Sequence, residues 1–356
     1  MYIFYIISNR KAGMSVMKIG ADIGIDLGTN TVLIYMDNSE LVLNEPAVVA
    51  ADTKTGKLLC AGHEAYKMLG RTHDGIEALY PLTAGVINHY SLTEQMMTYF
   101  LKKVCGNKIF MPRVMVCIPS VVTEVEKRAL VDAIHHSGAR NVTTIEEPVA
   151  AALGAGIDIS APYGTMIVDF GGGTTDIAVM SLNGIAISTS IKIAGNHFDA
   201  EIMKYVKNKY DLLIGEKTAE QIKNTVGGFM PRDEEIFVEA KGRNVIKGLP
   251  ESIKITSAEI LPIMLDAMQE VIAKIQWVLE QTSPELIVDI FSDGIRLTGG
   301  CANIFGIDEL IREKTGLKTV IPPKPELCVV IGTGVALKYI DKLDFESHKY
   351  RTYEEV

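Results

Sequence analysis

One local pattern occurs twice in this chain and restricts its fold more than any other feature. In each copy an apolar strand ends in an aspartate, turns over glycines and returns as a second apolar strand, which predicts a β-hairpin. The first copy covers residues 23–36 around the turn GTN, and the second covers residues 166–180 around GGG. The aspartates, Asp26 and Asp169, stand 143 residues apart. Solenoid repeats recur every 20 to 50 residues or so, and this much longer spacing therefore favours two duplicated lobes.

The length of the chain agrees with two lobes. Single hydrophobic cores usually stop growing at about 250 to 300 residues, and this chain has 356 residues, of which 47% are hydrophobic and 22% are charged. Such a composition is typical of a folded α/β protein. The other predicted elements are a strand at residues 113–118, helices at 122–137, 149–156, 198–210 and 219–225, and a small polar subdomain at 232–255.

A capping box predicts one long helix in the second half of the chain. Thr256 is followed three residues later by Glu259, and an apolar stripe at helical spacing then continues through Ile260, Met264, Ala267, Val271, Ile275 and Val278. We assign this stripe to the core. Further turns are predicted at the GG of residues 299–300 and at the GTG of residues 332–334. No low-complexity linker separates the lobes, so we expect them to share a hinge.

Charge and cysteine content limit the partners and the compartment. The net charge of −9 gives no long-range attraction to nucleic acid or to an anionic bilayer, so we expect no nucleic-acid partner and only local, apolar membrane contact. The five cysteines are odd in number and form no CxxC pair, as is usual for reduced thiols in the cytoplasm. Residues 1–18 are apolar and then basic, unlike a secretory signal. We expect them to form a flexible tail. Because Met14 and Met17 stand just before the first strand, an over-extended start codon is the favoured interpretation, and a membrane-touching arm is the alternative.

The two hairpins suggest a shared phosphate site. Glycines allow backbone N–H groups to close around phosphate oxygens. Asp26 and Asp169 would repel each other and the phosphates unless a hard cation lay between them, and Mg²⁺ fits because it is held largely through its waters. A single glycine hairpin is usually only a turn. Two in register, with further glycine turns downstream, predict nucleotide binding.

Several other kinds of site are excluded by their missing motifs. The sequence contains no GxxxxGK[ST] loop, no dinucleotide fingerprint after the first strand and no GxSxG elbow. The seven histidines have no metal-ligand spacing. We assign His135 and His136 to a solvated helix face.

Six runs of the sequence resemble one known family. They are IGIDLGTNT, NEPAVVA, IEEPVAAALGAG, VDFGGGTTD, LTGG and IGTGVAL, and in this order and spacing they resemble the MreB-type bacterial actins from about residue 19 to residue 337. The hairpins and the glycine turns are specific for the superfamily of actin, Hsp70 and sugar kinases. The runs NEPAVVA and IEEPVAAA narrow the resemblance to MreB.

The resemblance implies an actin-like α/β fold, in which duplicated ribonuclease-H-type lobes surround a nucleotide cleft and each lobe carries a smaller inserted subdomain. The expected division is subdomain IA at residues 19–37, 81–150 and 332–345, IB at 38–80, IIA at 151–195 and 256–331, IIB at 196–255, and flexible tails at 1–18 and 346–356.

The resemblance also assigns residues to an ATP·Mg²⁺ site. Glu126 matches the glutamate that orients or deprotonates the attacking water, whereas its spacing alone favours a helix-surface charge. Thr174 and Thr175 match residues that support this water or contact the γ-phosphate, and a purely structural role is the alternative. The metal-holding carboxylates are Asp26 and Asp169. The remaining cofactor-binding residues are Gly28, Thr29 and Asn30 in the first phosphate loop, Gly171, Gly172 and Gly173 in the second, Glu220 and Lys223 beside the ribose and adenine, and Gly299, Gly300 and Cys301 in the nucleoside turn.

An apolar loop is the expected membrane contact. Ile109, Phe110 and Met111 match a loop that inserts into the membrane in MreB proteins, and nearby Lys102, Lys103, Lys108 and Arg113 would supply local positive charge. A loop packed onto its own domain is the alternative.

Two positions depart from the family pattern. Asn196 stands where the family has the first aspartate of GGDxxD, and Cys301 stands where it has the last glycine of LTGGG. Nucleotide binding is still expected, and the two departures bear on the rate of hydrolysis and on the nucleotide dependence of assembly.

The resemblance implies a weak Mg²⁺-dependent ATPase that forms cytoskeletal filaments. Its partners would be other copies of itself, stacked head to tail into single or paired protofilaments, the inner face of the cell membrane and shape-determining proteins. A small-molecule kinase of the same superfamily is the alternative. A chaperone-type ATPase is disfavoured, because it needs a peptide-binding domain after the lobes and this chain reaches Val356 soon after the last motif ends at Leu337.

Overall fold

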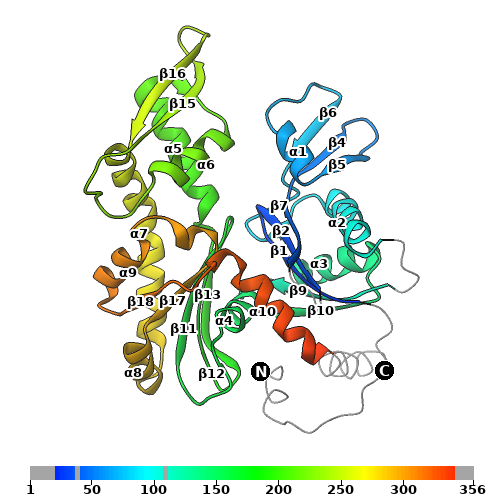
Figure 1. Ribbon diagram of the computed structural model, residues 1–356, viewed down its shortest axis with the longest axis vertical. Helices are drawn as coiled ribbons and strands as arrows, with labels where there is room; N and C mark the ends of the chain where they lie inside the picture. Colours follow the sequence, from blue (N-terminus) through cyan, green and yellow to red (C-terminus); the bar gives the residue numbers. More distant parts are fainter. Residues whose placement is uncertain (1–20, 37–40, 107–110, 341–356) are drawn as a thin grey trace.

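The computed structural model describes residues 21–36, 41–106 and 111–340. Two lobes stand side by side in Figure 1, and each has a larger lower part and a smaller upper part. Each lower part is built on a five-stranded sheet. No helix in the described ranges is both long enough and apolar enough to cross a membrane.

The sheet of lobe I contains the first predicted hairpin. Its strand order is β10-β9-β1-β2-β3, with β1 antiparallel to β2 and parallel to β9. Helices α2 and α3 supply buried side chains to its core. The bounds are β1 Asp22–Leu27, β2 Thr31–Met36, β3 Leu41–Pro46, β9 Arg113–Ile118, β10 Asn141–Glu146, α2 Tyr90–Cys105 and α3 Glu124–His136.

The sheet of lobe II repeats this arrangement. Its order is β13-β12-β11-β17-β18, and β11 lies between an antiparallel β12 and a parallel β17 as β1 lies between β2 and β9. The predicted duplication is therefore confirmed at the level of strand pairing. The bounds are β11 Thr165–Phe170, β12 Thr175–Ser181, β13 Gly184–Ile191, β17 Ile295–Thr298, β18 Thr319–Val320, α8 Pro284–Asp293, η1 Gly300–Asn303, α9 Ile307–Thr315 and η2 Pro325–Leu327.

Smaller sheets form the upper parts of both lobes (Figure 1). The predicted boundary at residue 38 is wrong in one respect, because β3 pairs with β2 and so extends the larger sheet of lobe I. A short hairpin, β7–β8, connects the upper part of lobe I to its lower part. The bounds are β4 Val49–Asp52, β5 Leu58–Ala61, α1 His63–Met68, β6 Ile76–Leu79, β7 Leu82–Thr83 and β8 Val86–Ile87 in lobe I, and α5 Gly195–Tyr210, β14 Leu212–Leu213, α6 Glu216–Val226, β15 Phe237–Asn244 and β16 Pro250–Thr256 in lobe II.

The long predicted helix is α7, Ser257–Gln281. Its capping box is formed as predicted, since Thr256 and Glu259 exchange hydrogen bonds with each other's backbone N–H groups. The predicted stripe faces the core of lobe II, where five of its members are fully buried: Ile260, Met264, Val271, Ile275 and Val278.

Two helices join the lobes, at the place where a shared hinge would lie. In Figure 1, α4 (Glu147–Gly154) and α10 (Cys328–Ala336) lie between the two sheets, and η3 (Leu337–Tyr339) follows α10. Their side chains share one hydrophobic cluster with residues from both sheets, including Met115 of lobe I and Ile167 of lobe II. A continuous core therefore connects the lobes.

The GTG segment at residues 332–334 differs from its prediction. It was predicted as a turn, but it lies inside α10. A Cβ atom at Gly332 would stand 1.7 Å from the carbonyl oxygen of Ala150, and one at Gly154 would stand 1.8 Å from that of Cys328. These glycines therefore permit the backbones of α4 and α10 to touch.

Substitution at this helix contact is expected to destabilise the whole protein. Gly332→Ala places a methyl group where the backbone of α4 lies, and such overpacking should lower the free energy of unfolding by about 2 kcal/mol or more. The control is Gly184→Ala, because a Cβ there meets only the carbonyl oxygen of Ser181 at 3.8 Å. Urea denaturation of both variants measures the difference, and equal unfolding midpoints would contradict the assigned contact.

Candidate nucleotide-binding site

The two glycine turns touch each other across the lobes. A Cβ atom at Gly173 would stand 2.3 Å from Oγ1 of Thr29, and one at Gly172 would stand 2.7 Å from Cγ of Asn30. Any larger residue at these positions would push the turns apart. The turn of the β7–β8 hairpin joins the same contact, where the backbone N–H of Gly85 donates to Oγ1 of Thr29 at 3.0 Å.

Each turn is closed by the same internal hydrogen bond. The N–H of Gly28 donates to the carbonyl of Thr31, and the N–H of Gly171 donates to the carbonyl of Thr174, both at 3.0 Å. These two N–H groups therefore hold the turns in shape. Phosphate contacts would fall to the residues that follow them in each turn.

A reciprocal amide pair links the lobes beside the turns. Nδ2 of Asn30 donates to Oδ1 of Asn196 at 2.6 Å, and Nδ2 of Asn196 donates to Oδ1 of Asn30 at 2.9 Å. The backbone N–H of Asn196 also donates to the carbonyl of Gly172 at 2.8 Å. The departure from the family pattern at residue 196 thus replaces an acidic group with an uncharged bridge between the two hairpins.

The two predicted metal-holding carboxylates lie close together. Burial, and to a smaller extent the nearby charge of Asp169, raises the pKa of Asp26 to about 7. Burial also raises the pKa of Asp169 to about 7, although Oγ1 of Thr298 donates to its Oδ1 at 2.5 Å. Both groups therefore resist ionisation unless a cation offsets their charge.

Two further carboxylates in this cluster were missed by the sequence analysis. Asp176 lies opposite Asp169 in the β11–β12 hairpin, and it accepts hydrogen bonds from the N–H and hydroxyl of Ser120 at 3.0 Å. Burial raises the pKa of Glu147 well above its usual range, and the charges of Asp176, Asp26 and Asp169 add to this effect. Glu147 is the second glutamate of the run IEEP, directly before a proline at the start of α4. This position in the run was the feature of the sequence from which Glu147 could have been predicted as a site residue.

Glu126, the predicted catalytic glutamate, caps its own helix. Its carboxylate accepts hydrogen bonds from the backbone N–H and the hydroxyl of Thr123 at 2.8 and 2.7 Å. These bonds lower its pKa. The contact serves α3, so a role for Glu126 at the triphosphate stays a prediction from the resemblance.

The two predicted threonines differ in their surroundings. Thr175 is fully buried, and its hydroxyl donates to the carbonyl of Ile193 at 2.6 Å, which is the structural role that the sequence left open. The side chain of Thr174 hydrogen-bonds to Asp176 and lowers the pKa of that group. Of the two hydroxyls, that of Thr174 is bound within the carboxylate cluster.

The predicted nucleoside residues surround the start of α5. Nζ of Lys223 donates to Oδ2 of Asp199 at 2.8 Å and to the carbonyl of Gly195 at 3.1 Å. Sγ of Cys301 donates to the carbonyl of Gly171 at 3.3 Å, so this residue is connected directly to the second phosphate loop. Burial raises the pKa of the Cys301 thiol to about 11, which keeps it protonated and unreactive.

The glycines of the nucleoside turn have different roles. Gly299 has a φ of 83°, and a Cβ atom there would stand 2.2 Å from the carbonyl oxygen of Phe170, so only glycine fits. A Cβ atom at Gly300 would meet nothing within 4 Å. Gly300 therefore borders open space.

Glu220 is bound by the opposite lobe. Oε2 of Glu220 accepts a hydrogen bond from the hydroxyl of Tyr66 at 3.0 Å. The structure thus brings together the two phosphate loops and the two nucleoside elements, whereas Glu126 belongs to a separate contact. Within the described ranges no three His, Cys, Asp or Glu side chains are grouped as metal ligands. The donor set fits Mg²⁺, which keeps several waters and needs only one or two carboxylates.

The predicted membrane loop is only partly described. Ile109 and Phe110 lie outside the described residues, and Met111 is 57% exposed. Two of the nearby basic residues are paired, because Lys103 bonds to Glu45 and Arg113 forms two 2.8 Å bonds to Asp22. These two residues are therefore less available to a membrane surface than the sequence suggests.

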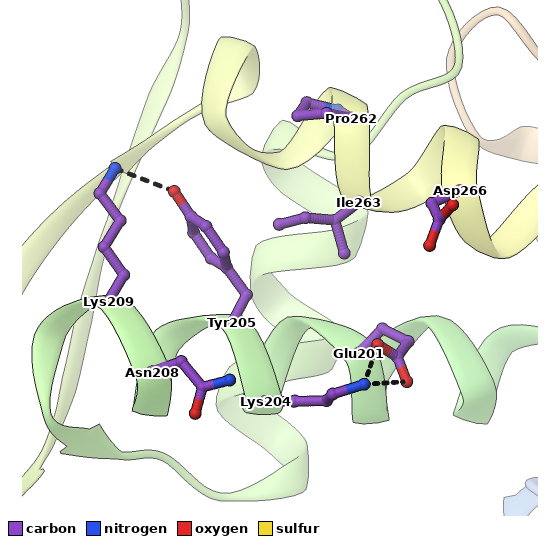
Figure 2. Close-up of a pocket in the computed structure, with 8 residues that line it drawn as sticks. All are labelled: Glu201, Lys204, Tyr205, Asn208, Lys209, Pro262, Ile263 and Asp266. Carbon is purple, nitrogen blue, oxygen red and sulfur yellow. Dashed lines mark hydrogen bonds and ion pairs between the residues drawn. The ribbon is translucent and has the colours of Figure 1, made fainter.

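A separate cavity lies away from the carboxylate cluster, between α5 and α7 (Figure 2). It measures about 530 Å³ and is lined by none of the predicted site residues. In Figure 2 its lysines are bound by neighbouring side chains: Lys204 pairs with Glu201, and Lys209 bonds to Tyr205.

Comparisons with known proteins agree with this geometry. The family model described as "MreB/Mbl protein" matches residues 20–345. The cell shape-determining protein Mbl of Bacillus subtilis (strain 168) is 45% identical over 325 residues, which cover 90% of this chain and 97% of that protein. The cell shape-determining protein MreB of Escherichia coli (strain K12) is 44% identical over 326 residues, with 90% and 94% covered.

Solved structures show the same fold. MreB5 of Spiroplasma citri bound to ADP has a TM-score of 0.87 and 39% identity, and the match covers 91% of this chain and 98% of that chain. A MamK double helical filament has a TM-score of 0.77 at 19% identity, covers 90% and 99% of the two chains, and supports the fold alone. The expected actin-like fold is therefore confirmed.

The raised pKa values predict how stability depends on pH. A carboxyl group whose folded-state pKa is raised from 3.8 to about 7 holds a proton over a range in which the unfolded chain has lost it, so the unfolding free energy falls as pH rises from about 4 to about 7. Asp26→Asn should stabilise the protein by on the order of 2 kcal/mol at pH 8 in EDTA without nucleotide, and by less at pH 5. Urea denaturation at both pH values measures this, with Asp266→Asn on the exposed side of α7 as control. A gain that is the same at both pH values would contradict the assigned burial.

Proposed function

The chain belongs to the MreB/Mbl protein family, and from that premise we propose that it binds ATP with Mg²⁺, hydrolyses the ATP slowly and assembles into filaments. The filaments would lie in the cytoplasm against the inner face of the cell membrane and, with partner proteins, help to determine cell shape. The observation that carries the proposal is the contact between the two glycine turns, with Asp26 and Asp169 beside it. The names of the relatives favour this function over a small-molecule kinase.

Nucleotide binding would use groups from both lobes. The backbone N–H groups of Thr29 and Asn30 in one turn, and of Gly172 and Gly173 in the other, would contact the phosphates. Asp26 and Asp169 would hold Mg²⁺ through its waters, and the bound ion would offset the charge of carboxylates and phosphates. MreB5 of Spiroplasma citri, a relative of 38–39% identity, was solved with both ADP and AMPPNP.

Glu147 is the glutamate best placed to act as general base. It lies in the carboxylate cluster, and its raised pKa brings it nearer to the range in which a carboxylate accepts a proton from water effectively. Thr174 bonds to Asp176 in the same cluster and would help to position the attacking water. After hydrolysis, loss of the γ-phosphate would remove contacts to both turns and loosen the closure of the lobes.

Two glutamate variants separate the candidates for this role. Glu147→Gln should leave ATP binding intact and slow phosphate release on the order of 10²-fold, because the amide cannot accept the proton of the attacking water. Glu126→Ala should lower the unfolding midpoint through loss of the capping box and leave the rate of phosphate release per bound ATP unchanged. If Glu126→Ala slows release and Glu147→Gln does not, the assignment from the resemblance is right and ours is wrong.

Exposed apolar side chains stand at opposite ends of lobe II. The turn between β15 and β16 exposes Ile246 by 76% and Leu249 by 63%, and α8 exposes Val288 by 65% and Phe291 by 71%. In Figure 1 the β15–β16 hairpin is at the top of this lobe and α8 is at its lower end. Contact between the hairpin of one subunit and α8 of the next would be heterologous, and such contacts generate open filaments. We assign the head-to-tail contact to these two surfaces.

Charged substitutions at the two ends test this contact. Ile246→Asp and Phe291→Asp should each abolish sedimentation with ATP, because burial of an unpaired charge in an apolar interface costs several kcal/mol, while ATP binding is retained. Each variant keeps one intact surface, so an equal mixture of the two should form dimers and no filaments. Val42→Asp, at an exposed apolar residue of β3, is the control. Filaments from either variant, or a mixture that stays monomeric, would contradict the assignment.

A kinase would replace the filament function if two results were obtained together. The wild-type protein would fail to sediment in ATP, and a sugar or another small alcohol would stimulate its turnover of ATP. Ultracentrifugation of the protein in ATP and in ADP, with and without liposomes, measures assembly and membrane attachment together. Liposomes should increase the pelleted fraction if the loop containing Met111 reaches the lipid.

A further inference from the structure

A second contact joins the lobes between their upper parts. Tyr66 of α1 belongs to the upper part of lobe I, and its hydroxyl donates to Oε2 of Glu220, on α6 of lobe II, at 3.0 Å. Nζ of Lys217, also on α6, donates to the carbonyl oxygen of Tyr66 and lies 4.0 Å from the centre of its ring. In Figure 1, α1 and α6 face each other across the upper halves of the molecule. One tyrosine is thus held at its hydroxyl, its ring and its backbone.

The surroundings of Tyr66 favour a persistent bond. Burial and the charge of Glu220 raise the pKa of the Tyr66 hydroxyl to about 12, with smaller effects from Asp199 and Glu216. The phenol therefore stays a hydrogen-bond donor at physiological pH. Tyr80 is close enough for Tyr66 and Glu220 to add to the effect of burial, which is the main cause of its raised pKa.

We propose that Tyr66, Lys217 and Glu220 form a cross-lobe latch that sets the rate at which nucleotide enters and leaves. The inference rests on the proposed nucleotide function and adds regulation to it. At the phosphate end the lobes already touch through the glycine turns and through the pair Asn30–Asn196. The lobes must therefore separate at the α1–α6 end for a nucleotide to pass, and separation there breaks the bonds of Tyr66.

The latch differs from a ligand contact in its kinetic effect. Its bonds join protein to protein, so they oppose opening whether the nucleotide is inside or outside. Weakening the latch should accelerate uptake and release by similar factors and leave the dissociation constant nearly unchanged. A residue that contacts the nucleotide would change the dissociation constant, mainly through the release rate.

The latch is tested by measuring nucleotide exchange in variants that each lose one of its interactions. Tyr66→Phe removes only the hydroxyl that bonds to Glu220 and keeps the ring beneath Lys217, and Lys217→Met removes the ammonium group. The matched control is Tyr163→Phe, which loses one hydroxyl bond, to the carbonyl of Asp289 at 3.1 Å, in the lower part of lobe II. The readout is the release of tritium-labelled ADP into excess unlabelled ADP below the assembly concentration, together with its rate of uptake.

We expect Tyr66→Phe to speed both release and uptake about fivefold, as loss of one charge-assisted hydrogen bond predicts, with affinity within twofold of wild type. Lys217→Met should act in the same direction, and the double variant should show less than the product of the two effects because both bonds hold one side chain. Exchange at the wild-type rate in Tyr66→Phe, or weaker affinity with unchanged uptake, overturns the latch. If the wild-type protein retains no labelled ADP, the nucleotide function itself is overturned. The unfolding midpoint of each variant is measured as well, so that a loss of folded protein is not mistaken for either outcome.

Discussion

The rest of the structure depends on the direct contact between two glycine turns, one from each lobe. Gly172 and Gly173 leave no room for a Cβ atom against Asn30 and Thr29, so the lobes can approach until the ends of both hairpins form one surface. This approach brings Asp26 and Asp169 together. It also lets Ser120 of lobe I donate to Asp176 of lobe II. A duplicated hairpin becomes a single site only because the turns carry no side chains at the point of contact.

The same approach concentrates acidic groups that are unfavourable in the empty protein. Asp26, Glu147, Asp169 and Asp176 all have raised pKa values, with burial as the main cause for each. Such a cluster reduces stability at neutral pH and is retained where a cation and a phosphate group make use of it. Around it the lobes are bridged by hydrogen bonds that need no second charged group, as in Asn30–Asn196 and Tyr66–Glu220. The lobes can therefore remain closed without a ligand to balance the charge.

Local sequence patterns predicted the local structure well. The hairpins, the strand Arg113–Ile118 and the capping box of α7 follow from the nearest residues in the chain, and each is present as predicted. The role of the GTG segment could not be read this way, because its glycines are required by the backbone of α4, which is distant in sequence. The pairing of β3 with β2 depends on a register that the pattern does not report. Glu147 was overlooked although its place in the run IEEP was a signal, because that run does not report which glutamate shares a cluster with the aspartates.

The contact between α4 and α10 has a mechanical consequence. Backbone lies on backbone at Gly154 and Gly332, so no side chains interlock at that crossing, and a rotation of one lobe against the other would have its axis there. The displacement that such a rotation gives to any part of a lobe grows with the distance of that part from the axis. The turn that carries Ile246 lies at the far end of lobe II from this axis (Figure 1). A small angular change at the phosphate turns would therefore become a larger movement of the outermost hairpin.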